Sequence, residues 1–420
     1  MSFDTRKGGC VCYHLIEDDG LDKYRQFTGL GNAYNLFCNQ CWANQAELEA
    51  NLRQVSPEKF EDVDGYGSCE GFIGEAEVLQ RPSDLKFIHA LHWLRKPLPS
   101  SILSIQPEHN VTTSTWIAIL ASREVVRIEL DKGTFNRLCV IKSSSINFSE
   151  KIAVHLSPDN QLLAIVNERG SLGIVVDLST GKPMMELNRG KYYPAQTPFP
   201  VAFFQVSDEI FLVHGTNWNR LDISNPRTGK LLTERAYVPS NEANTRPEHY
   251  LDYFHGFPVI SPDAKWIIED GWIWMPYGVT RLWNLQRWLT QNVWESEDGV
   301  SLKWFNWRLY FWDVPLCWTN NQTIAVWGFG DGDDTMIPAV QLFDAESGKL
   351  LRWFAGPKQG ALYFDTYLFS TSNEGTDVWD IETGERLLHD PDLKPAVYHP
   401  HKHQFLTILP DATFRLSYWI

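Results

Sequence analysis

Four cysteines near the start of the chain have the spacing of a metal site. Cys10 and Cys12 are separated by one residue, and Cys38 and Cys41 are separated by two. Zinc in structural sites takes four tetrahedral thiolate or imidazole ligands, and each short pair can place two sulfurs on one tight turn. The pattern therefore predicts a closed, structural zinc site rather than a catalytic one.

The segment around these cysteines is too short to bury a large core, so a bound metal would help to stabilise it. Cys69 and His14 are reserve ligands. The alternatives are ordinary buried or free thiols and a redox-active pair. Seven cysteines, an odd number, in a chain without a visible signal peptide speak against a framework of disulfides.

A second candidate site is the acidic loop Gly330–Asp334. Its carboxylates, on Asp331, Asp333 and Asp334, alternate around a glycine and resemble part of a calcium-binding loop. The loop has no following glutamate at the spacing of an EF-hand. The sequence therefore leaves two alternatives, a solvated hairpin tip or a weak cation site.

Three histidines near the end of the chain, His399, His401 and His403, lie at a spacing of two residues. One face of a strand with this spacing could chelate a metal ion. The intervening Pro400 and Lys402 instead favour a turn between the first two strands of the last repeat.

A tryptophan-rich stretch interrupts the regular pattern between two repeats. Its part from Trp288 to Trp312 lies mostly in an insertion, 291–308. The candidate partner-binding residues are Trp288, Trp294, Trp304 and Trp307. Exposed tryptophans there would form an aromatic hot spot for another protein. The alternative is an insertion that its tryptophans anchor to the rest of the fold.

Motifs for nucleophilic catalysis, phosphate binding and zinc hydrolysis are absent from the sequence. It contains no Gly-x-Ser-x-Gly elbow, no phosphate-binding loop and no His-Glu-x-x-His helix. We name no catalytic residue.

The elements that must position any site are marked by a recurring turn. Asp, a short spacer, Ser or Thr, Gly and usually Lys occur at 177–182, 344–349 and 380–385, and in stretched form from Asp222 to Lys230. The Asp carboxylate can accept bonds from free backbone N–H groups, and Gly supplies the positive φ of a bulged hairpin. Such repetition predicts a stack of similar sheets.

From about residue 86 the chain reads as short strands separated by turns, which is typical of an all-β fold. We count seven repeats, and the last, 395–420, has room for only three strands. A ring of four-stranded sheets is commonly closed by a strand from the other end of the chain. We prefer 101–105 for this strand, with 86–91 as the alternative.

These features resemble WD40-type β-propeller repeats over roughly residues 100–420. The resemblance rests on the turns at Ser157-Pro158-Asp159 and Ser261-Pro262-Asp263, the ending Val378-Trp379-Asp380 and the Thr-Gly hairpins. It implies a divergent seven-bladed propeller, or an eight-bladed one if 86–106 forms its own sheet. The expected domains are a small cysteine-rich module at 1–84 and a propeller at 85–420, closed by an N-terminal strand.

The formal net charge of −15 argues against general nucleic-acid binding, and no apolar run is long enough to span a membrane. Without a visible secretory signal we expect a cytoplasmic protein. The leading hypothesis is a non-enzymatic scaffold that binds other proteins.

The alternative is a propeller enzyme, either quinoprotein-like or a hydrolase or lyase with a site in the central channel. The segment Asp344–Trp353 is similar to the tryptophan-docking repeat of quinoprotein dehydrogenases, although its Trp falls one residue late. Those proteins are usually exported, so the missing signal also argues against a quinone cofactor.

Overall fold

The computed structural model describes residues 78–236, 248–274, 276–330 and 336–420, whose strands form seven sheets. Six of these sheets have four strands and one has three. Neighbours in each sheet are mostly consecutive in the chain, which is the topology of a propeller blade. The expectation of an all-β, seven-bladed propeller is thus confirmed. Residues 1–77 of the expected cysteine-rich module lie outside the described residues.

The chain divides into two compact units, which we describe separately. Of the described residues, the first unit holds those from 78 to 84 together with those in Met275–Thr280 and Lys303–Asp392. The second unit holds Leu85–Trp274, Arg281–Leu302 and Leu393–Ile420.

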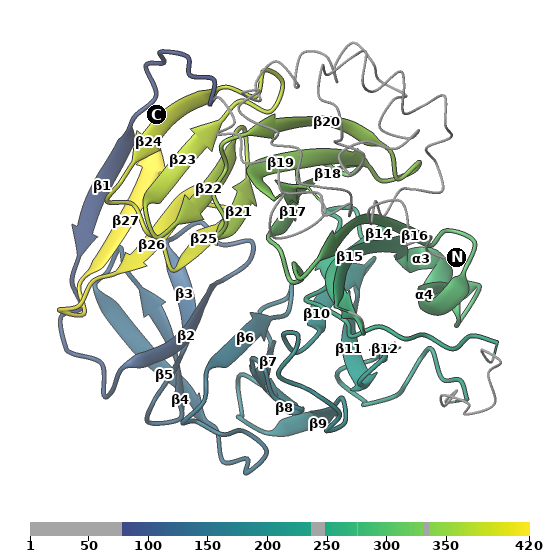
Figure 1. Ribbon diagram of the computed structural model, residues 1–420. Helices are drawn as coiled ribbons and strands as arrows, with labels where there is room; N and C mark the ends of the chain where they lie inside the picture. Colours follow the sequence, from purple (N-terminus) through teal and green to yellow (C-terminus); the bar gives the residue numbers. More distant parts are fainter. Residues whose placement is uncertain (1–77, 237–247, 275, 331–335) are drawn as a thin grey trace. The chain divides into compact units, whose positions relative to one another are not determined.

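The second unit contains four complete sheets, in the orders β1-β27-β26-β25, β2-β3-β4-β5, β6-β7-β8-β9 and β10-β11-β12 (Figure 1). Their strands are β1 (Phe87–His92), β2 (Ile102–Pro107), β3 (Thr115–Leu120), β4 (Glu124–Glu129), β5 (Thr134–Val140), β6 (Ile152–Leu156), β7 (Leu162–Asn167), β8 (Leu172–Asp177), β9 (Pro183–Asn188), β10 (Val201–Val206), β11 (Glu209–Asn217), β12 (Arg220–Ser224), β25 (Val397–His399), β26 (Gln404–Ile408) and β27 (Phe414–Trp419).

The fourth repeat forms the sheet β13-β14-β15-β16, whose strands fall in both units. Its elements are β13 (Val259–Ile260), β14 (Trp266–Ile273), β15 (Tyr277–Asn284), α3 (Leu285–Thr290), α4 (Glu295–Asp298) and β16 (Lys303–Leu309). The two short helices occupy the connection between β15 and β16, where other repeats have a tight hairpin. The expected insertion between repeats, 291–308, therefore lies within one sheet, because Lys303–Leu309 is the fourth strand of that sheet.

The first unit contains two complete sheets, β17-β18-β19-β20 and β21-β22-β23-β24. Their strands are β17 (Leu316–Trp318), β18 (Thr323–Phe329), β19 (Ile337–Asp344), β20 (Leu350–Ala355), β21 (Ala361–Phe364), β22 (Leu368–Ser372), β23 (Gly375–Trp379) and β24 (Arg386–Asp390).

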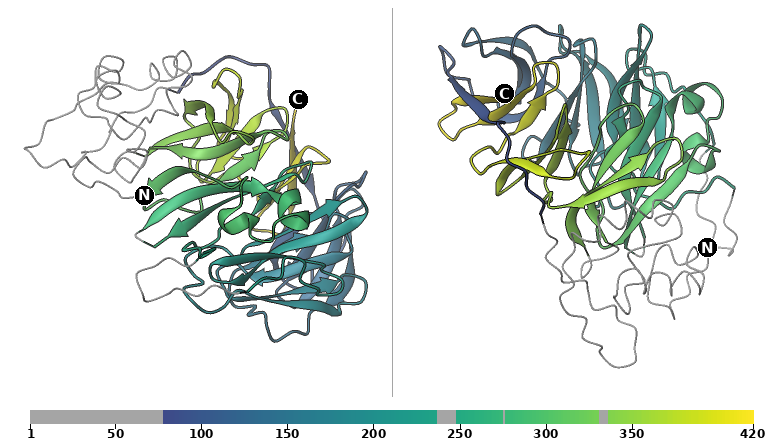
Figure 2. Two further views of the ribbon diagram at one scale, coloured as in Figure 1. Left: turned by 90° about the vertical axis from the view of Figure 1, so that its right-hand side faces the viewer. Right: turned by 90° about the horizontal axis from the view of Figure 1, so that it is seen from above.

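The middle strands of two sheets in the second unit are apolar on both faces because the neighbouring sheets of that unit cover them. In the second unit every residue of β3 and β7 is buried. The sheets of β2–β5 and β6–β9 share one cluster of aliphatic side chains, which includes Ile117, Val154 and Ile165. Figure 2 shows these sheets of the second unit lying side by side. Continuous runs of β-branched residues therefore read as strands buried on both faces.

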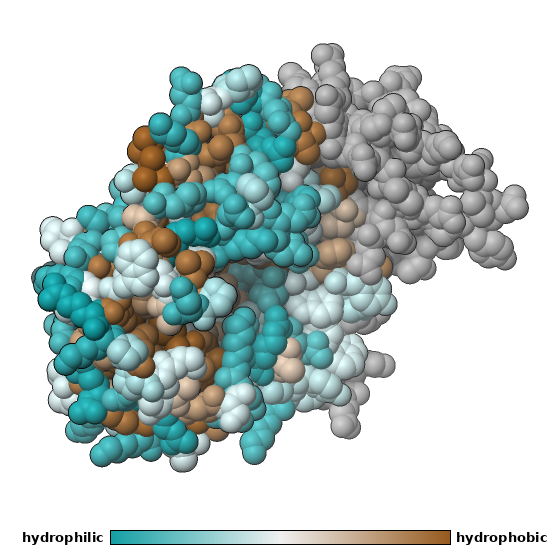
Figure 3. Space-filling model, turned by 90° about the vertical axis from the view of Figure 1, so that its left-hand side faces the viewer, coloured by the Kyte–Doolittle hydropathy of each residue, from teal (hydrophilic) through white to brown (hydrophobic). Residues whose placement is uncertain are grey.

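The last sheet is completed by β1, which pairs antiparallel with β27 from Phe87↔Trp419 to His92↔Phe414. Figure 1 shows β1 alongside β27. The preferred candidate, 101–105, was wrong, because Ile102–Pro107 is the first strand of its own sheet. On the side of the molecule where β1 lies, hydrophobic residues are interspersed with hydrophilic ones (Figure 3).

The recurring turn has the hydrogen bonds that its residue types predict. The Oδ1 atom of Asp177 accepts bonds from the backbone N–H of Thr180 (2.9 Å) and from the hydroxyl of Ser179 (2.6 Å). Gly181 has a φ of 69°, and its N–H donates to the carbonyl of Asp177 at 2.8 Å. The bonds to its carboxylate, above all the bond from the Ser179 hydroxyl, lower the pKa of Asp177 below its ordinary value.

The stretched copy of the turn differs from the expectation. Asn225, not Asp222, accepts the N–H of Thr228 (3.1 Å), and the N–H of Gly229 donates to the Asn225 carbonyl (2.9 Å). An amide oxygen accepts these bonds as well as a carboxylate does. Asp222 is thereby left for another role inside the protein.

Candidate partner-binding surface

The structure describes some of the sequence-predicted site residues. Cys10, Cys12, Cys38 and Cys41 lie outside the described residues, as do Asp331, Asp333 and Asp334. The zinc and cation sites therefore stay predictions. Trp288 is completely buried, whereas Trp294, Trp304 and Trp307 are partly buried.

Trp288 lies in helix α3, immediately before the insertion, and packs inside the protein. Helix α3 begins after Asn284, whose side chain accepts the N–H of Arg287 at 2.8 Å as an N-cap. The Trp288 ring packs edge-on against Trp283, with centroids 5.8 Å apart, and its N–H donates to the carbonyl of Val293 at 3.2 Å. For this residue, the structure matches the anchoring alternative.

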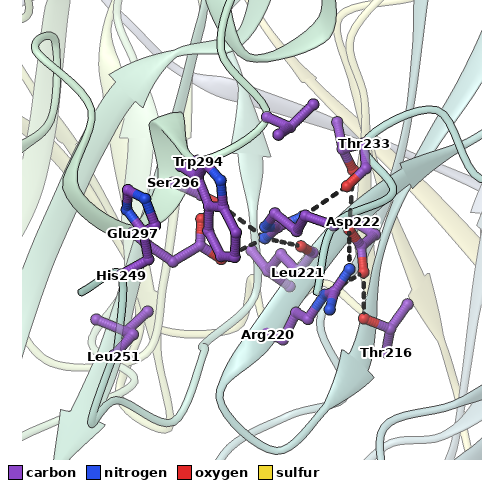
Figure 4. Close-up of polar contacts among 12 residues, drawn as sticks. Thr216, Arg220, Leu221, Asp222, Thr233, His249, Leu251, Trp294, Ser296 and Glu297 are labelled. Atoms are coloured by element: carbon purple, nitrogen blue, oxygen red, sulfur yellow. Dashed lines mark hydrogen bonds and ion pairs between the residues drawn. The ribbon is translucent and has the colours of Figure 1, made fainter. Parts of the chain in front are cut away.

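A network of buried charges holds helix α4 in place (Figure 4). The carboxylate of Asp222 in β12 is fully buried and forms an ion pair with Arg235. It also accepts bonds from the Nε of Arg220 (2.8 Å) and the hydroxyl of Thr233 (2.9 Å). On its other side, Arg235 forms an ion pair with Glu297 of α4. One guanidinium thus joins two carboxylates from two elements.

The guanidinium of Arg235 also contacts the ring of Trp294. Its central carbon lies 5.2 Å from the centroid of the Trp294 ring. The ring of His249 stacks on Trp294 at 4.2 Å and an interplanar angle of 10°, and its Nδ1 lies 2.8 Å from Asp298. Figure 4 shows His249 beside Trp294 and close to the buried charges. Trp294 is therefore held in one orientation.

The other two candidate tryptophans lie on β16 in the first unit. The rings of Trp304 and Trp307 stack with centroids 5.9 Å apart, and Tyr277 meets Trp307 edge-on at 6.2 Å. Neither tryptophan is among the exposed large hydrophobic residues. Partner binding at this pair stays a prediction.

A larger aromatic group lies in the second unit, where the loops after β9 and β11 and the end of β14 meet the segment before β13. We call it the aromatic platform, and it comprises Tyr192, Tyr193, Trp218, Phe254, Trp272 and Trp274. Five of its rings form a closed cycle of contacts, with centroid distances of 4.8 Å (Tyr192–Tyr193), 5.5 Å (Tyr193–Trp274), 5.3 Å (Trp274–Trp272), 4.6 Å (Trp272–Phe254) and 5.9 Å (Phe254–Tyr192).

The platform has a buried floor and an exposed top. Phe254 and Trp272 are 3% and 6% exposed. Tyr192, Tyr193 and Trp274 are 49%, 50% and 47% exposed. Single exposed aromatic residues are common, but contiguous ones supported from below are typical of an interface.

Arg189 positions the loop that carries the two tyrosines. Its side chain is buried and donates to the carbonyls of Gly170 (2.9 Å), Thr197 (2.9 Å) and Pro198 (2.8 Å). Two further bonds reach the carbonyl of Pro194 and the hydroxyl of Thr197. Burial and the nearby charge of Arg169 lower the pKa of Arg189 to about 10. The guanidinium remains protonated at neutral pH, and its bonds to Pro194, Thr197 and Pro198 hold the loop in place.

The floor is set by a close approach of two backbone segments. Phe254 and Trp272 exchange backbone hydrogen bonds of 2.7 and 3.0 Å. A Cβ atom on Gly256 would overlap the carbonyl oxygen of Asp270, and one on Gly271 would overlap that of Phe254. Glycine at both positions therefore lets the segments pair closely enough to stack their rings.

The sequence did not single out this platform. Tyr192 and Tyr193 lie in a loop with Gly190 and Pro194, and the other rings come from segments up to about 80 residues further along. The sequence feature that could have indicated an exposed aromatic site is local. Two adjacent tyrosines in a turn have no strand periodicity that would bury them.

The histidines near the end of the chain form the expected turn. Pro400–His403 connects β25 to β26. His399 is fully buried, and its ring meets Trp116 edge-on at 5.1 Å. Burial, with the nearby charges of His401 and His109, lowers the pKa of His399 to about 4. Throughout the described ranges, no group of three or more His, Cys, Asp or Glu side chains is arranged to hold a metal ion.

The inner strands of the sheets contain little acid–base chemistry. Within the second unit β2 contacts β6 and β25, and within the first unit β17 contacts β21. The seven strands β2, β6, β10, β13, β17, β21 and β25 contain no Asp or Glu within their described bounds. These strands thus supply no carboxylate pair for a hydrolase.

Comparisons with known proteins leave the family open. No protein-family model and no curated protein matches the chain. Similar solved structures include a chain of the mitotic checkpoint complex (TM-score 0.49, 12% identity, 86% of this chain and 96% of that one) and BamB from Moraxella catarrhalis (0.49, 10%, 76% and 86%). The WD40 β-propeller domain of Doa1 is also similar (0.46, 12%, 78% and 96%). Within the described ranges no helix is long and apolar enough to cross a membrane.

Proposed function

We propose that this protein is a non-enzymatic interaction scaffold and that its aromatic platform binds another protein. The observation that carries the proposal is the cycle of five contacting rings, of which three are about half exposed. Tyrosine and tryptophan are the residues that most often dominate protein–protein binding energy.

The support beneath the rings strengthens this proposal. A buried arginine holds the loop of Tyr192 and Tyr193, and two glycines bring the floor segments together. Side chains fixed before binding lose less conformational freedom when a partner arrives. An aromatic surface built in this way suits recognition better than loose exposed rings do.

The platform is a better candidate than the tryptophan-rich insertion. Trp288 is buried, and Trp294 lies between a guanidinium and an imidazole ring. In contrast, Trp274 and the two tyrosines present about half of their surface. We therefore place the principal contact on the platform.

Affinity purification from cells that express the protein natively tests the proposal. The variant combines Tyr193→Ala with Trp274→Ala, which removes two exposed rings and leaves the buried floor. Trp93→Ala is the matched control, because Trp93 is 62% exposed and outside the platform. We expect a specific protein to be recovered with the wild type and the control but not with the double variant, provided that thermal unfolding shows all three to be folded. Equal recovery with the double variant, or no specific protein with the wild type, would contradict the proposal.

A further inference from the structure

The three exposed side chains of the aromatic platform carry polar groups that have no hydrogen-bond partner in the described part of the chain. Tyr192 and Tyr193 each end in a hydroxyl, and the indole of Trp274 has one N–H. The contacts of these side chains among the described residues are with other rings. An indole N–H can only donate, and a tyrosine hydroxyl donates readily, so the platform presents hydrogen-bond donors to a partner.

Tyr193 adopts a backbone conformation that a bulky residue rarely takes. Its φ is 44°, in the left-handed region that glycine and asparagine favour. The loop imposes this conformation, because Arg189 binds the carbonyl of Pro194 and the N–H of Gln196 donates to the carbonyl of Tyr193 at 3.2 Å. Strained residues of this kind are concentrated at functional sites. Folding alone would favour Gly or Asn at this position, so the half-exposed ring of Tyr193 indicates binding.

The angles between the exposed rings suit a ligand with several sides. Tyr193 meets Tyr192 at an interplanar angle of 88° and Trp274 at 59°. The rings therefore face in different directions and do not form one flat surface. A polyproline II helix has three residues per turn, so rings at steep angles to one another can contact two of its sides.

A proline-rich segment also complements the donors of the platform. Proline has no N–H, so such a segment offers backbone carbonyls as acceptors beside flat apolar rings. The polyproline II helix forms no internal hydrogen bonds, which leaves these carbonyls available. Addition of a β-strand would instead need an open sheet edge, whereas the backbone groups of Phe254 and Trp272 already bond to each other.

From these observations we infer that the partner segment is rich in proline and binds the aromatic platform as a polyproline II helix. Its pyrrolidine rings pack on Tyr192, Tyr193 and Trp274, and its carbonyls accept bonds from their hydroxyl and N–H groups. This inference rests on the proposed function and names the class of partner. Both surfaces are formed before they meet, so little conformational freedom is lost on binding.

A random peptide display library provides the probe. Selection is performed on wild-type full-length protein, after depletion on the Tyr193→Ala/Trp274→Ala variant. We expect the enriched peptides to carry prolines at positions i and i+3, which lie on one side of the helix. Enriched peptides without proline, or no enriched peptide at all, would overturn the inference. In either case a specific protein that depends on the platform in the affinity purification would leave the proposed function standing.

Variants of Tyr193 separate the contribution of its ring from that of its hydroxyl. Tyr193→Asn removes the ring and keeps a residue that tolerates a positive φ, so it should fold as well as the wild type and weaken binding of the selected peptides by about tenfold or more. Tyr193→Phe removes only the hydroxyl and should weaken binding by about threefold to tenfold.

Tyr418→Phe is the matched control for the hydroxyl, because Tyr418 is 37% exposed and lies in β27, outside the platform. We expect this variant to bind the selected peptides like the wild type, and thermal unfolding confirms that each variant is folded. Unchanged affinity in Tyr193→Asn, or a loss in Tyr193→Phe no greater than in the control, would contradict this mode of binding.

Discussion

His399 is a buried histidine in an unfavourable setting. Among the described residues neither of its ring nitrogens has a hydrogen-bond partner, although the side chain is fully buried against Trp116. A buried polar group without a partner costs about 1–3 kcal/mol. The packing of its ring therefore stabilises the fold, whereas its two unpartnered nitrogens lower the free energy of unfolding.

Replacing His399 by Phe should make folding less sensitive to acid. The folded-state pKa is about 4, whereas an unfolded histidine has a pKa of about 6.5, so the unfolded chain binds the proton first as the pH falls. The histidine thus destabilises the wild type increasingly below about pH 6.5, by about 2 kcal/mol at about pH 5.

Urea unfolding of wild type and His399→Phe at about pH 7 and about pH 5 measures this difference. We expect the variant to be at least as stable as the wild type near neutrality and to gain about 2 kcal/mol relative to it at the lower pH. A variant that is less stable near neutrality, or a stability difference that does not change with pH, would show that the nitrogens of His399 are satisfied.

Individual residue types predicted the turns well but not every residue within them. The pattern of Asp, Ser or Thr, and Gly identified the hairpin closed by Gly181, with its bonds to Asp177. In the stretched copy the sequence offered both Asp222 and Asn225, and either side chain can accept the required bonds. Only the arrangement of β12, which points Asp222 at Arg235, separates the two.

At the scale of elements, buried ion pairs stabilise the connection between β15 and β16, which is longer than a tight hairpin. Arg235 contacts Asp222 in β12 and Glu297 in α4, all three buried or nearly so. Removing one member of such a group would leave an uncompensated buried charge, which typically costs about 3–5 kcal/mol. The short helices, which are below the length that is stable alone, are therefore held by tertiary contacts.

The edge strand β1 allows a matched test of ring closure. Lys86 and Ile420 exchange both backbone hydrogen bonds, so the alternation of an antiparallel pair makes Ala90↔Leu416 a hydrogen-bonded pair and Leu91↔Arg415 a non-bonded one. Ala90→Pro removes an N–H that donates to β27. Leu91→Pro removes one that points away from the sheet.

We expect Ala90→Pro to lower the free energy of unfolding by about 2 kcal/mol more than Leu91→Pro does. Thermal and urea unfolding of both variants would measure the difference. Similar losses in the two variants would mean that β1 contributes only its side chains, and no loss in either would mean that the last sheet is stable without it.

The sequence predicted the incomplete last repeat but not the strand that completes it. Ser101–Ile105 and Lys86–Leu91 are both short apolar runs of strand length. Pro97 and Pro99 made the earlier run look separate from the first repeat, although they lie in the link between β1 and β2. A pairing between residues more than 300 positions apart leaves no local signal that distinguishes two such runs.

At the scale of the whole chain, the repeats specify the fold and the loops specify the surface. The fold could be predicted because each repeat carries its own strand and turn signals. The aromatic platform could not, because its rings come from four segments that meet only in three dimensions. Loops positioned by a rigid scaffold are where binding residues commonly lie.

The cysteines of the whole chain divide into two groups, which sharpens the zinc prediction. Cys139 and Cys317 belong to the described sheets, and burial raises the pKa of their thiols to about 11 and about 12. Zinc binds the thiolate, which these two residues rarely form near neutrality. Any bound zinc should therefore depend on the five cysteines of the N-terminal segment, Cys10, Cys12, Cys38, Cys41 and Cys69.

Elemental analysis of purified full-length protein tests this division. We expect about one zinc ion per chain in the wild type, as four-ligand structural sites hold. Cys38→Ser should lose most of it, because three remaining ligands bind more weakly than four, whereas Cys139→Ala should retain it. Chelation should expose N-terminal thiols to a thiol reagent, while Cys139 and Cys317 react only on unfolding. Zinc-free wild-type protein, or equal loss in the two variants, would refute a site built from the paired cysteines.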